Sequence, residues 1–345
     1  MQLPREIVVG NETLELIGKI CKKLGFSEST LVVTGPHTHH IAGKKVFDIL
    51  DDAGISVDQL IVSSFTVKDV NTVEEKIREL KPQVVLGIGG GTKIDIAKLG
   101  SARQEVPFIS IPTTASHDGI ASSVVSLRGL KKPYSRVAQS PMAIVVDTSV
   151  IIQASHRFAA SGCGDVLAKF TAVRDWELAH NAKNEYYGEY AASLSLMGAR
   201  LVAEHADTIQ PEIEEGVRVL LEALISCGVA MSIAGSSRPC SGSEHLFSHA
   251  LDVISPNSAM HGEQCGLGAI MMARLHGLKW KRVKETLERV GAPTTAEELG
   301  VESDHIIKAL TLACTIRPER YTILNERKLG YEAAEKLARA TGVIE

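Results

Sequence analysis

The first half of the chain alternates short runs of β-branched and apolar residues with segments of helical periodicity. Strand candidates are residues 30–34, 60–63, 84–88, 108–111, 122–127 and 143–146, and helical patterns cover residues 41–53 and 73–80. This alternation predicts a parallel sheet, because parallel neighbours need crossover connections that are usually helices. Continuous apolar runs such as Val84-Val85-Leu86 are typical of strands that helices cover on both faces.

From about residue 150 onward, turn residues become sparse and long helical periods follow one another. Helical patterns cover residues 159–181, 186–207, 214–235, 244–253, 263–276, 281–290, 304–314 and 331–341. The second half is therefore predicted to be all-helical. Because 345 residues exceed the size at which one core usually stops growing, we expect two domains. They are an α/β domain at residues 1–153 and a helical domain at residues 154–345.

Composition excludes several classes of protein. Hydrophobic residues make up 44% of the chain and charged residues 23%, which is ordinary for a folded enzyme and excludes a disordered chain. The formal net charge is -4 without a long basic run, so nucleic acid is not expected as a partner. The six cysteines contain no C-x-x-C pair and the N-terminus lacks a signal pattern, which favours the cytoplasm. No uninterrupted apolar stretch approaches the ~20 residues that cross a bilayer.

A glycine-rich turn, Gly87-Ile88-Gly89-Gly90-Gly91-Thr92-Lys93, directly follows an apolar strand and opens a helix. Glycines let the backbone N–H groups approach a pyrophosphate closely, and the start of a helix favours negative charge. The turn matches neither the P-loop pattern nor a clean G-x-G-x-x-G, so ATP chemistry does not follow from it. A tight turn without a ligand is the alternative.

A second polar turn, Pro112-Thr113-Thr114-Ala115-Ser116-His117-Asp118-Gly119, follows the next strand. Ligands of an open parallel sheet gather beyond the carboxyl ends of its strands, so both turns are expected to line one crevice. The hydroxyls of Thr113, Thr114, Ser116 and Ser122 could bond a ribose, a phosphate or an amide. A loop whose serine and threonine side chains only cap their own backbone is the alternative.

Three histidines of the helical half have the spacing of a metal site. His245 and His249 are four residues apart and share one helix face, and His261 follows a Ser-Pro-Asn break. Asp165, which follows Gly162-Cys163-Gly164, is the candidate oxygen ligand because small neighbours allow close approach. On spacing alone, both His245 and His249 are possible ligands.

Other histidines and the cysteines are not expected to bind a metal. His37, His39 and His40 follow a strand in a turn-rich context. The scattered cysteines, including Cys163 and Cys265, are interpreted as small buried apolar residues and not as thiolate ligands.

Taken in order, these motifs resemble the archaeal glycerol-1-phosphate dehydrogenases. That family is part of the iron-containing alcohol dehydrogenase, glycerol dehydrogenase and dehydroquinate synthase superfamily. The resemblance covers essentially the whole chain, including the segment Arg317-Pro-Glu-Arg320-Tyr321-Thr-Ile-Leu324. It implies a dehydroquinate synthase-like fold, in which a Rossmann-like N-terminal α/β domain precedes an all-α C-terminal domain.

The resemblance also implies roles for individual residues. The pyrophosphate of NAD or NADP would be held by Gly89, Gly90, Gly91, Thr92 and Lys93. The rest of the dinucleotide would be held by Thr113, Thr114, Ala115, Ser116 and Ser122. A zinc ion would be bound by Asp165, His245 and His261, whereas Asp118 and His249 would contact the substrate. The family pattern thus places only the first histidine of the helical pair on the metal.

Two departures from related patterns are informative. Lys169 stands where iron-dependent relatives have a fourth ligand, a histidine, and the three remaining ligands with an open position suit catalytic zinc. Gly35 stands where NAD-specific relatives usually have an acidic residue. With His37, Lys44 and Lys45 nearby, we expect NADPH to be accepted as well as NADH.

The implied activity is the interconversion of dihydroxyacetone phosphate and sn-glycerol 1-phosphate, which supplies the backbone of archaeal membrane lipids. Alternatives are a glycerol dehydrogenase acting on the unphosphorylated alcohol, a dehydroquinate synthase, and a non-catalytic NAD(P) sensor. Lys169, Arg157 and Arg320 are all possible partners of a substrate phosphate. Because long basic side chains are more often surface residues than ligands, none of them is included in the predicted site. Long apolar helices favour a homo-oligomer of undetermined size.

Overall fold

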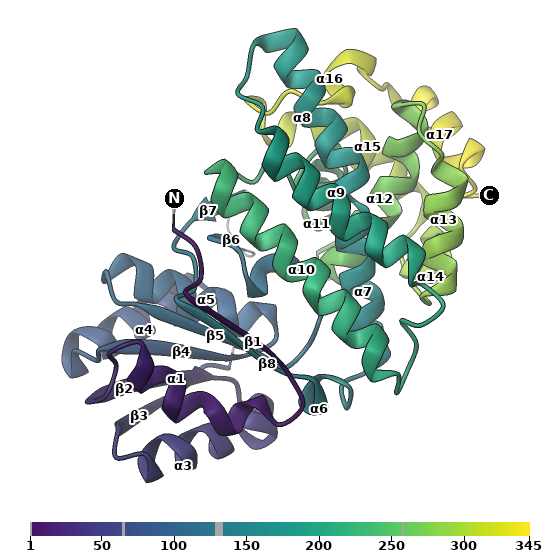
Figure 1. The fold of residues 1–345 in the computed structure, drawn as a ribbon. Coiled ribbons are helices and arrows are strands. Elements are labelled where there is room, and N and C mark those ends of the chain that lie inside the picture. The colour runs from purple at the N-terminus through teal and green to yellow at the C-terminus, as the bar shows by residue number, and fades with distance from the viewer. Residues whose placement is uncertain (1, 64–65, 128–133, 257–258) are drawn as a thin grey trace.

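The computed structural model describes residues 2–63, 66–127, 134–256 and 259–345. The first half folds around a six-stranded parallel sheet with the strand order β1-β8-β5-β4-β2-β3 (Figure 1). These strands are β1 (Glu6–Gly10), β2 (Ser29–Thr34), β3 (Ser56–Ile61), β4 (Val84–Gly89), β5 (Phe108–Pro112) and β8 (Ala143–Asp147). The prediction of a parallel α/β fold is confirmed.

Helices cover both faces of this sheet, because successive strand residues point to opposite sides. Leu86 faces α1 and α3, whereas its neighbour Val85 faces α4 and α5. The helices and short turns of this half are η1 (Thr13–Leu16), α1 (Ile17–Lys23), α2 (Pro36–Thr38), η2 (His39–Gly43), α3 (Lys44–Asp52), α4 (Val67–Leu80), α5 (Gly91–Arg103) and η3 (Asp118–Ile120).

Two strands of this half differ from their predicted positions. The strand predicted at residues 60–63 is β3, which ends at Ile61 and begins earlier in a stretch that contains Asp58 and Gln59. This edge strand is only partly buried, so its apolar pattern is weak. The candidate at residues 122–127 is β6 (Val124–Leu127), which pairs antiparallel with β7 (Tyr134–Val137) outside the main sheet. Neither β1 nor α1 was predicted from the sequence pattern.

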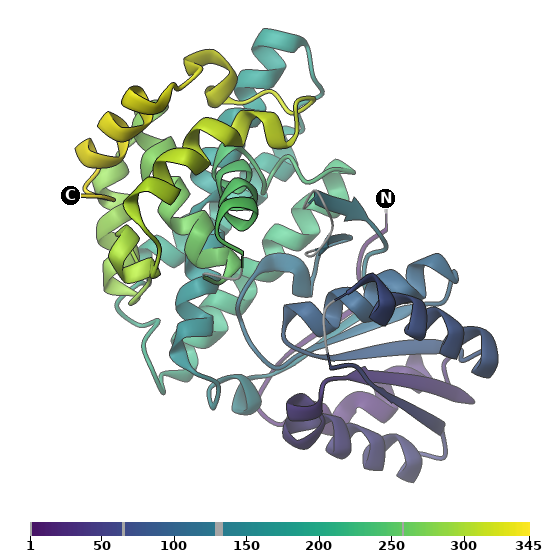
Figure 2. The ribbon, with the colours of Figure 1, turned by 180° about the vertical axis from the view of Figure 1, so that it is seen from behind.

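The second half is helical, as predicted. Its helices are α6 (Thr148–Ile151), α7 (His156–Leu167), α8 (Lys169–Lys183), α9 (Glu189–Glu204), α10 (Glu214–Ala234), α11 (Ser243–Ile254), α12 (His261–Leu275), α13 (Trp280–Arg289), α14 (Ala296–Leu299), α15 (Ser303–Ile316), α16 (Ile323–Arg327) and α17 (Tyr331–Ala340). One predicted helix, at residues 159–181, is in fact two, because Ala168 separates α7 from α8. The helices form a bundle that packs beside the sheet (Figure 2).

One apolar core joins the two halves. A single cluster of buried side chains extends from Val85 in β4 to Leu310 in α15. Within the described residues, only α10 has the length and composition to cross a membrane, and 61% of the relevant window is buried inside the protein. Its apolar surface is therefore largely used in the core.

Candidate active site

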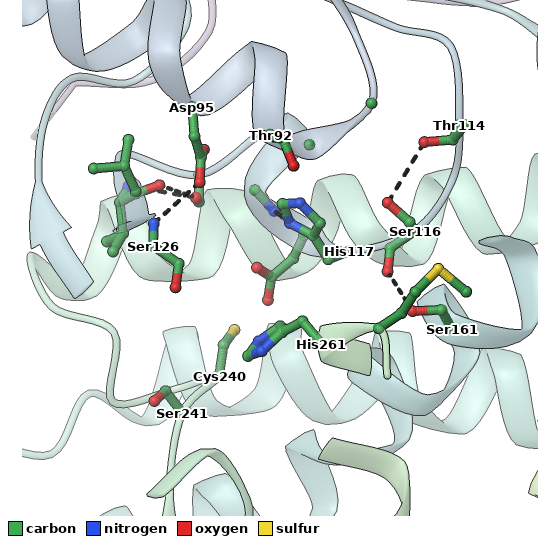
Figure 3. Close-up of a pocket in the computed structure, with 18 of the residues that line it drawn as sticks. Thr92, Asp95, Thr114, Ser116, His117, Ser126, Ser161, Cys240, Ser241 and His261 are labelled. Atoms are coloured by element: carbon green, nitrogen blue, oxygen red, sulfur yellow. Dashed lines mark hydrogen bonds between the residues drawn. The ribbon is translucent and has the colours of Figure 1, made fainter. Parts of the chain in front are cut away.

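The two polar turns lie side by side at the carboxyl ends of β4 and β5, which are parallel neighbours in the sheet. They form one wall of a cavity of about 360 Å³, a size suited to small ligands (Figure 3). Residues of the helical half form the opposite wall. The cavity is lined by Thr38, Gly90, Gly91, Thr92, Lys93, Asp95, Thr114, Ser116, His117, Asp118, Gly119, Ser122, Val124, Val125, Ser126, Phe158, Ser161, Met231, Ser237, Cys240, Ser241, His245, His249, Met260 and His261.

Most of the predicted cofactor residues line this cavity, but three stand behind its wall. Gly89, Thr113 and Ala115 are not part of the lining. The Thr113 amide instead donates to the carbonyl oxygen of Gly89 at 3.0 Å, which ties the two turns together. These residues therefore shape the turns and do not face the cavity.

Gly91 is the first residue of α5, and a larger residue there would displace the ring of His117. A Cβ at this position would lie 1.5 Å from Nε2 of His117. The imidazole of His117 thus packs directly on the start of the helix, and its Nδ1 accepts a hydrogen bond from the Gly119 amide at 2.9 Å. His117 lines the cavity but was absent from the predicted site, although it lies inside the turn that the sequence analysis had singled out.

Asp165, His245 and His261 converge although they come from α7, α11 and α12. Their potential ligand atoms, together with Sγ of Cys265, all lie within 4.8 Å of one another. His249 lies outside this group and lines the cavity with its ring stacked on that of His261, at a centroid separation of 6.1 Å. The three predicted metal ligands therefore lie together, and the separate roles of His245 and His249 stay a prediction. Cys265, which the sequence analysis interpreted as an apolar residue, is a possible fourth donor.

Small residues allow these helices to approach. A Cβ on Gly162 would lie 2.1 Å from the carbonyl oxygen of Ala115, and one on Gly164 would lie 2.3 Å from that of Gly262. Any side chain at either position would push α7 away from the second polar turn or from α12. The glycines around Asp165 therefore bring its carboxylate between the two halves.

Partners behind the histidines orient their rings. His245 Nδ1 donates to the fully buried carboxylate of Glu244 at 2.8 Å, which leaves Nε2 directed toward Asp165 at 3.5 Å. Ser248 donates to Gln264 at 2.6 Å, so its oxygen accepts from His261 Nδ1 at 3.3 Å. In both rings Nε2 is the nitrogen left for a metal, as in known carboxylate–histidine–metal arrangements. Glu244 was not predicted, although a carboxylate next to a candidate ligand was a usable signal.

Lys169 is completely buried and forms ion pairs with two carboxylates. Its Nζ lies 2.6 Å from Asp165 and 2.7 Å from Asp118. Burial alone would raise the pKa of Asp165, but the charge of Lys169 holds that pKa well below its usual value. Burial, with the neighbouring Asp165, raises the pKa of Asp118. The Asp118 amide also donates to Asp165 at 2.9 Å, so these three residues form one compact network.

A second buried lysine holds the cavity wall in place. Lys98 of α5 forms an ion pair with Asp95 at 3.1 Å and donates to the carbonyl oxygens of Gly119 and Val124 at 2.7 and 3.0 Å. Asp95 also accepts from the Ser126 amide at 3.0 Å (Figure 3). This pair was not predicted, although its spacing on a helix that opens with glycines was visible in the sequence.

The basic residues considered for a substrate phosphate occupy different environments. Arg157 forms a bidentate ion pair with Glu263, at 2.6 and 2.9 Å, and Lys169 is engaged by two carboxylates. Arg320 is buried and donates to Ser237 at 2.8 Å and to the carbonyl oxygen of Ser241. Near the predicted NADP site, Lys45 pairs with Glu15 at 2.7 Å.

Known proteins resemble this chain along its whole length. The family model described as iron-containing alcohol dehydrogenase matches residues 8–155. A protein named NAD(P)+-dependent glycerol-1-phosphate dehydrogenase from Methanosarcina barkeri is 53% identical over 344 residues, covering 100% of this chain and 96% of that protein. One of the same name from Pyrococcus furiosus is also 53% identical, covering 100% of this chain and 99% of that protein.

Solved structures of the same fold are more distant in sequence. Glycerol dehydrogenase from Schizosaccharomyces pombe superposes with a TM-score of 0.80 at 21% identity, covering 98% of this chain and 89% of that one. A probable glycerol dehydrogenase from Sinorhizobium meliloti 1021 has a TM-score of 0.77 at 20% identity, covering 98% and 96% of the two chains. These likenesses confirm the predicted fold class.

Proposed function

The chain belongs to the family of glycerol-1-phosphate dehydrogenases, and we propose that it reduces dihydroxyacetone phosphate to sn-glycerol 1-phosphate with NADH or NADPH. The observation that carries this proposal is identity of 53% over 100% of the chain to relatives that bear this enzyme's name. The product would supply the glycerophosphate backbone of archaeal membrane lipids. The cavity supports the proposal, since the glycine-rich turn and the histidines His245 and His261 line it together.

The donor set fits zinc. One carboxylate and two imidazoles converge, each imidazole is held by a partner on its other nitrogen, and three such ligands leave a position for substrate. When bound, zinc acts as a Lewis acid that polarises the C2 oxygen of the substrate. NAD(P)H supplies the hydride that C2 receives.

The protein's own residues supply orientation and proton transfer. Gly90, Gly91 and Lys93 would hold the pyrophosphate at the start of α5, where unpaired amides and the helix dipole favour negative charge. His249 would deliver the proton that the C2 oxygen gains, because its ring lines the cavity beside His261 and an imidazole can donate a proton. Asp118 would orient the substrate hydroxyl, and Lys169 keeps its carboxylate and that of Asp165 in place.

Use of both cofactors is supported at the end of β2. Gly35 places no acidic side chain there, and a Cβ at this position would lie 2.9 Å from Cε of Lys93. An aspartate would therefore both repel a 2′-phosphate and crowd the lysine. Lys45 is engaged by Glu15, so His37 and Lys44 are the remaining candidates for contact with the 2′-phosphate.

Three further features belong to this proposal. The enzyme acts on a small molecule; we propose that it works in the cytoplasm and as a homo-oligomer. The division into domains at residues 1–153 and 154–345 is also proposed, since the sheet ends at Asp147 and the long helices begin at His156.

The test is oxidation of NADPH and NADH with dihydroxyacetone phosphate and with dihydroxyacetone, before and after chelation of metal. We expect turnover with the phosphorylated ketone by either cofactor, loss of turnover on chelation and recovery with zinc. Chiral analysis should show sn-glycerol 1-phosphate as the product. Preference for dihydroxyacetone would instead identify a glycerol dehydrogenase, and absence of turnover with either ketone would support an NAD(P) sensor.

A further inference from the structure

Arg320 lies behind the turn that connects α10 to α11. Its side chain is 7% exposed, and its guanidinium donates to Oγ of Ser237 at 2.8 Å and to the carbonyl oxygen of Ser241. Ser237, Cys240 and Ser241 all line the cavity, on the same side as His245 and His261, and Figure 3 shows Cys240 and Ser241 near His261. A buried cation therefore stands one residue layer behind the wall of the active-site cavity.

In the described part of the chain no carboxylate pairs directly with Arg320, although the charges of Glu185 and Glu244 act on it and oppose the lowering of its pKa. Its neighbour Arg238, by contrast, pairs with Glu185 through two hydrogen bonds. Burial, together with the charges of Arg317 and Arg238, lowers the pKa of Arg320 to about 9. An arginine so placed remains protonated near neutrality. Burying an unpaired charge is costly, so the site favours an anionic ligand.

The polar groups in front of Arg320 suit such an anion. Ser237 uses its oxygen to accept from the guanidinium, so its own hydroxyl hydrogen can be donated to a ligand in the cavity. Ser241 contributes a second hydroxyl to the same wall. Serine hydroxyls backed by a buried arginine match a phosphate monoester, which carries three acceptor oxygens and close to two negative charges.

We propose that Ser237, Ser241 and Arg320 form the subsite for the phosphate group of the substrate. This inference rests on the proposed function, because it assigns the phosphate of dihydroxyacetone phosphate. The reacting carbonyl then lies toward His245 and His261, and the phosphate lies toward the α10–α11 turn. Arg157 and Lys169 are less suitable, since Glu263 neutralises the first and two carboxylates neutralise the second.

The same subsite gives a role to the C-terminal segment that the sequence analysis singled out. Arg238 donates to the carbonyl oxygen of Tyr321 at 2.9 Å, and the Ile323 amide donates to Asp175 at 2.7 Å. These bonds fix the backbone on the C-terminal side of Arg320. A chain segment 79 residues from Ser241 is thereby held against the cavity wall.

The experiment compares Arg320→Met with a matched control, Arg317→Met, in the zinc-loaded enzyme. Arg317 is an arginine of the same segment, and it pairs with Glu319 at 2.9 Å. We expect Arg320→Met to lower kcat/KM for dihydroxyacetone phosphate about 100-fold, as loss of a buried charge partner does, while that for dihydroxyacetone changes less than about threefold. Arg317→Met should leave both values unchanged. Inorganic phosphate should inhibit dihydroxyacetone reduction by the wild type and by Arg317→Met, but not by Arg320→Met.

If Arg320→Met does not fold, two milder variants test whether this subsite binds the substrate phosphate. Arg320→Lys keeps the positive charge but loses the planar guanidinium that donates to two partners, and Ser237→Ala removes one hydroxyl. Each should lose about tenfold in kcat/KM for the phosphorylated ketone alone. An equal loss with both ketones, or unchanged inhibition by inorganic phosphate, would overturn the subsite.

Failure of the proposed function would give a different result from failure of the subsite. In that case the wild type itself would not reduce dihydroxyacetone phosphate. Calorimetric titration of the wild type and Arg320→Lys with inorganic phosphate would then decide the subsite. Binding that weakens in the variant supports it, and equal binding or none overturns it.

Discussion

At the scale of single residues, the chain contains two Asp–Lys pairs of the same spacing in opposite environments. Asp165 and Lys169 are buried beside the candidate metal ligands, whereas Asp304 and Lys308 are exposed on α15. Removing one member of a buried pair leaves the other charge desolvated, and here Lys169 also neutralises Asp118. The same change at the surface leaves a charge that water solvates.

This contrast predicts the effect of Lys169→Met on stability. In metal-free protein we expect the free energy of unfolding to fall by about 3–5 kcal/mol, because two buried carboxylates lose their cation. The matched control, Lys308→Met, should change it little. Urea denaturation of both variants after chelation provides the measurement. Similar losses in the two variants would contradict the view that the buried network depends on Lys169.

The division of roles among the histidines predicts distinct metal contents. We expect His261→Ala to lose both zinc and turnover, whereas His249→Ala should retain about one zinc per chain and lose turnover. Elemental analysis of protein purified with zinc, alongside kinetic assays, measures both properties. A metal-free His249→Ala variant would show that spacing on the helix, and not the family pattern, identifies the ligands.

Cys265 allows a separate test of the three-ligand site. Burial raises the pKa of its thiol, so it remains protonated unless a metal displaces the proton. If zinc uses only Asp165, His245 and His261, Cys265→Ala should retain about one zinc per chain. Absorption spectra of the cobalt-substituted wild type should then lack a thiolate-to-metal band. Zinc loss in the variant together with such a band would make the cysteine a ligand.

At the scale of secondary-structure elements, the start of α5 predicts a sharp dependence on glycine. In Gly91→Ala the new methyl group would overlap the ring of His117, so either that ring or the glycine-rich turn must move, and both line the cavity. A displacement of about 1 Å can cost about 100-fold in function, and we expect NADPH affinity to fall by at least tenfold. The control is Gly330→Ala at the start of α17, where a Cβ meets nothing within 4 Å. Fluorescence titration with NADPH of the two variants gives the comparison.

The elements that the sequence revealed are those with strong local patterns. Strands β4 and β5 and the glycine-rich turn between β4 and α5 were predictable, because a continuous apolar run followed by glycines has few structural interpretations. The bounds of the edge strand β3 and the antiparallel pairing of β6 with β7 were not, because both depend on the partner strand and not on a local apolar pattern. The same limit applies to the site: residue spacing and then the resemblance named Asp165 and His245, whereas the partners of Glu244 and Lys98 were revealed only by the packed structure.

At the scale of the whole molecule, two features connect the halves. The cavity can connect them through bound ligands, and the apolar core connects them through direct packing. The cavity is lined by both halves, so NADPH and zinc should stabilise them together. The apolar cluster that extends from Val85 to Leu310 includes Ile151 and Ala160, which lie on either side of the proposed boundary at residues 153–154. A ligand that binds only the folded state stabilises it by about 2.7 kcal/mol at 100 times its Kd. Joint stabilisation is thus expected even if the halves are distinct domains.

Calorimetry separates the contribution of the core from that of the ligands. If the shared core dominates, the metal-free and cofactor-free protein should unfold in one cooperative transition, with equal calorimetric and van't Hoff enthalpies. NADPH and zinc should then raise Tm without changing the number of transitions. If the halves unfold independently, the free protein should show two transitions that merge only when the ligands bridge the cavity. Two transitions would support the boundary at residues 153–154 as a folding boundary, whereas one would make the two halves a single cooperative unit.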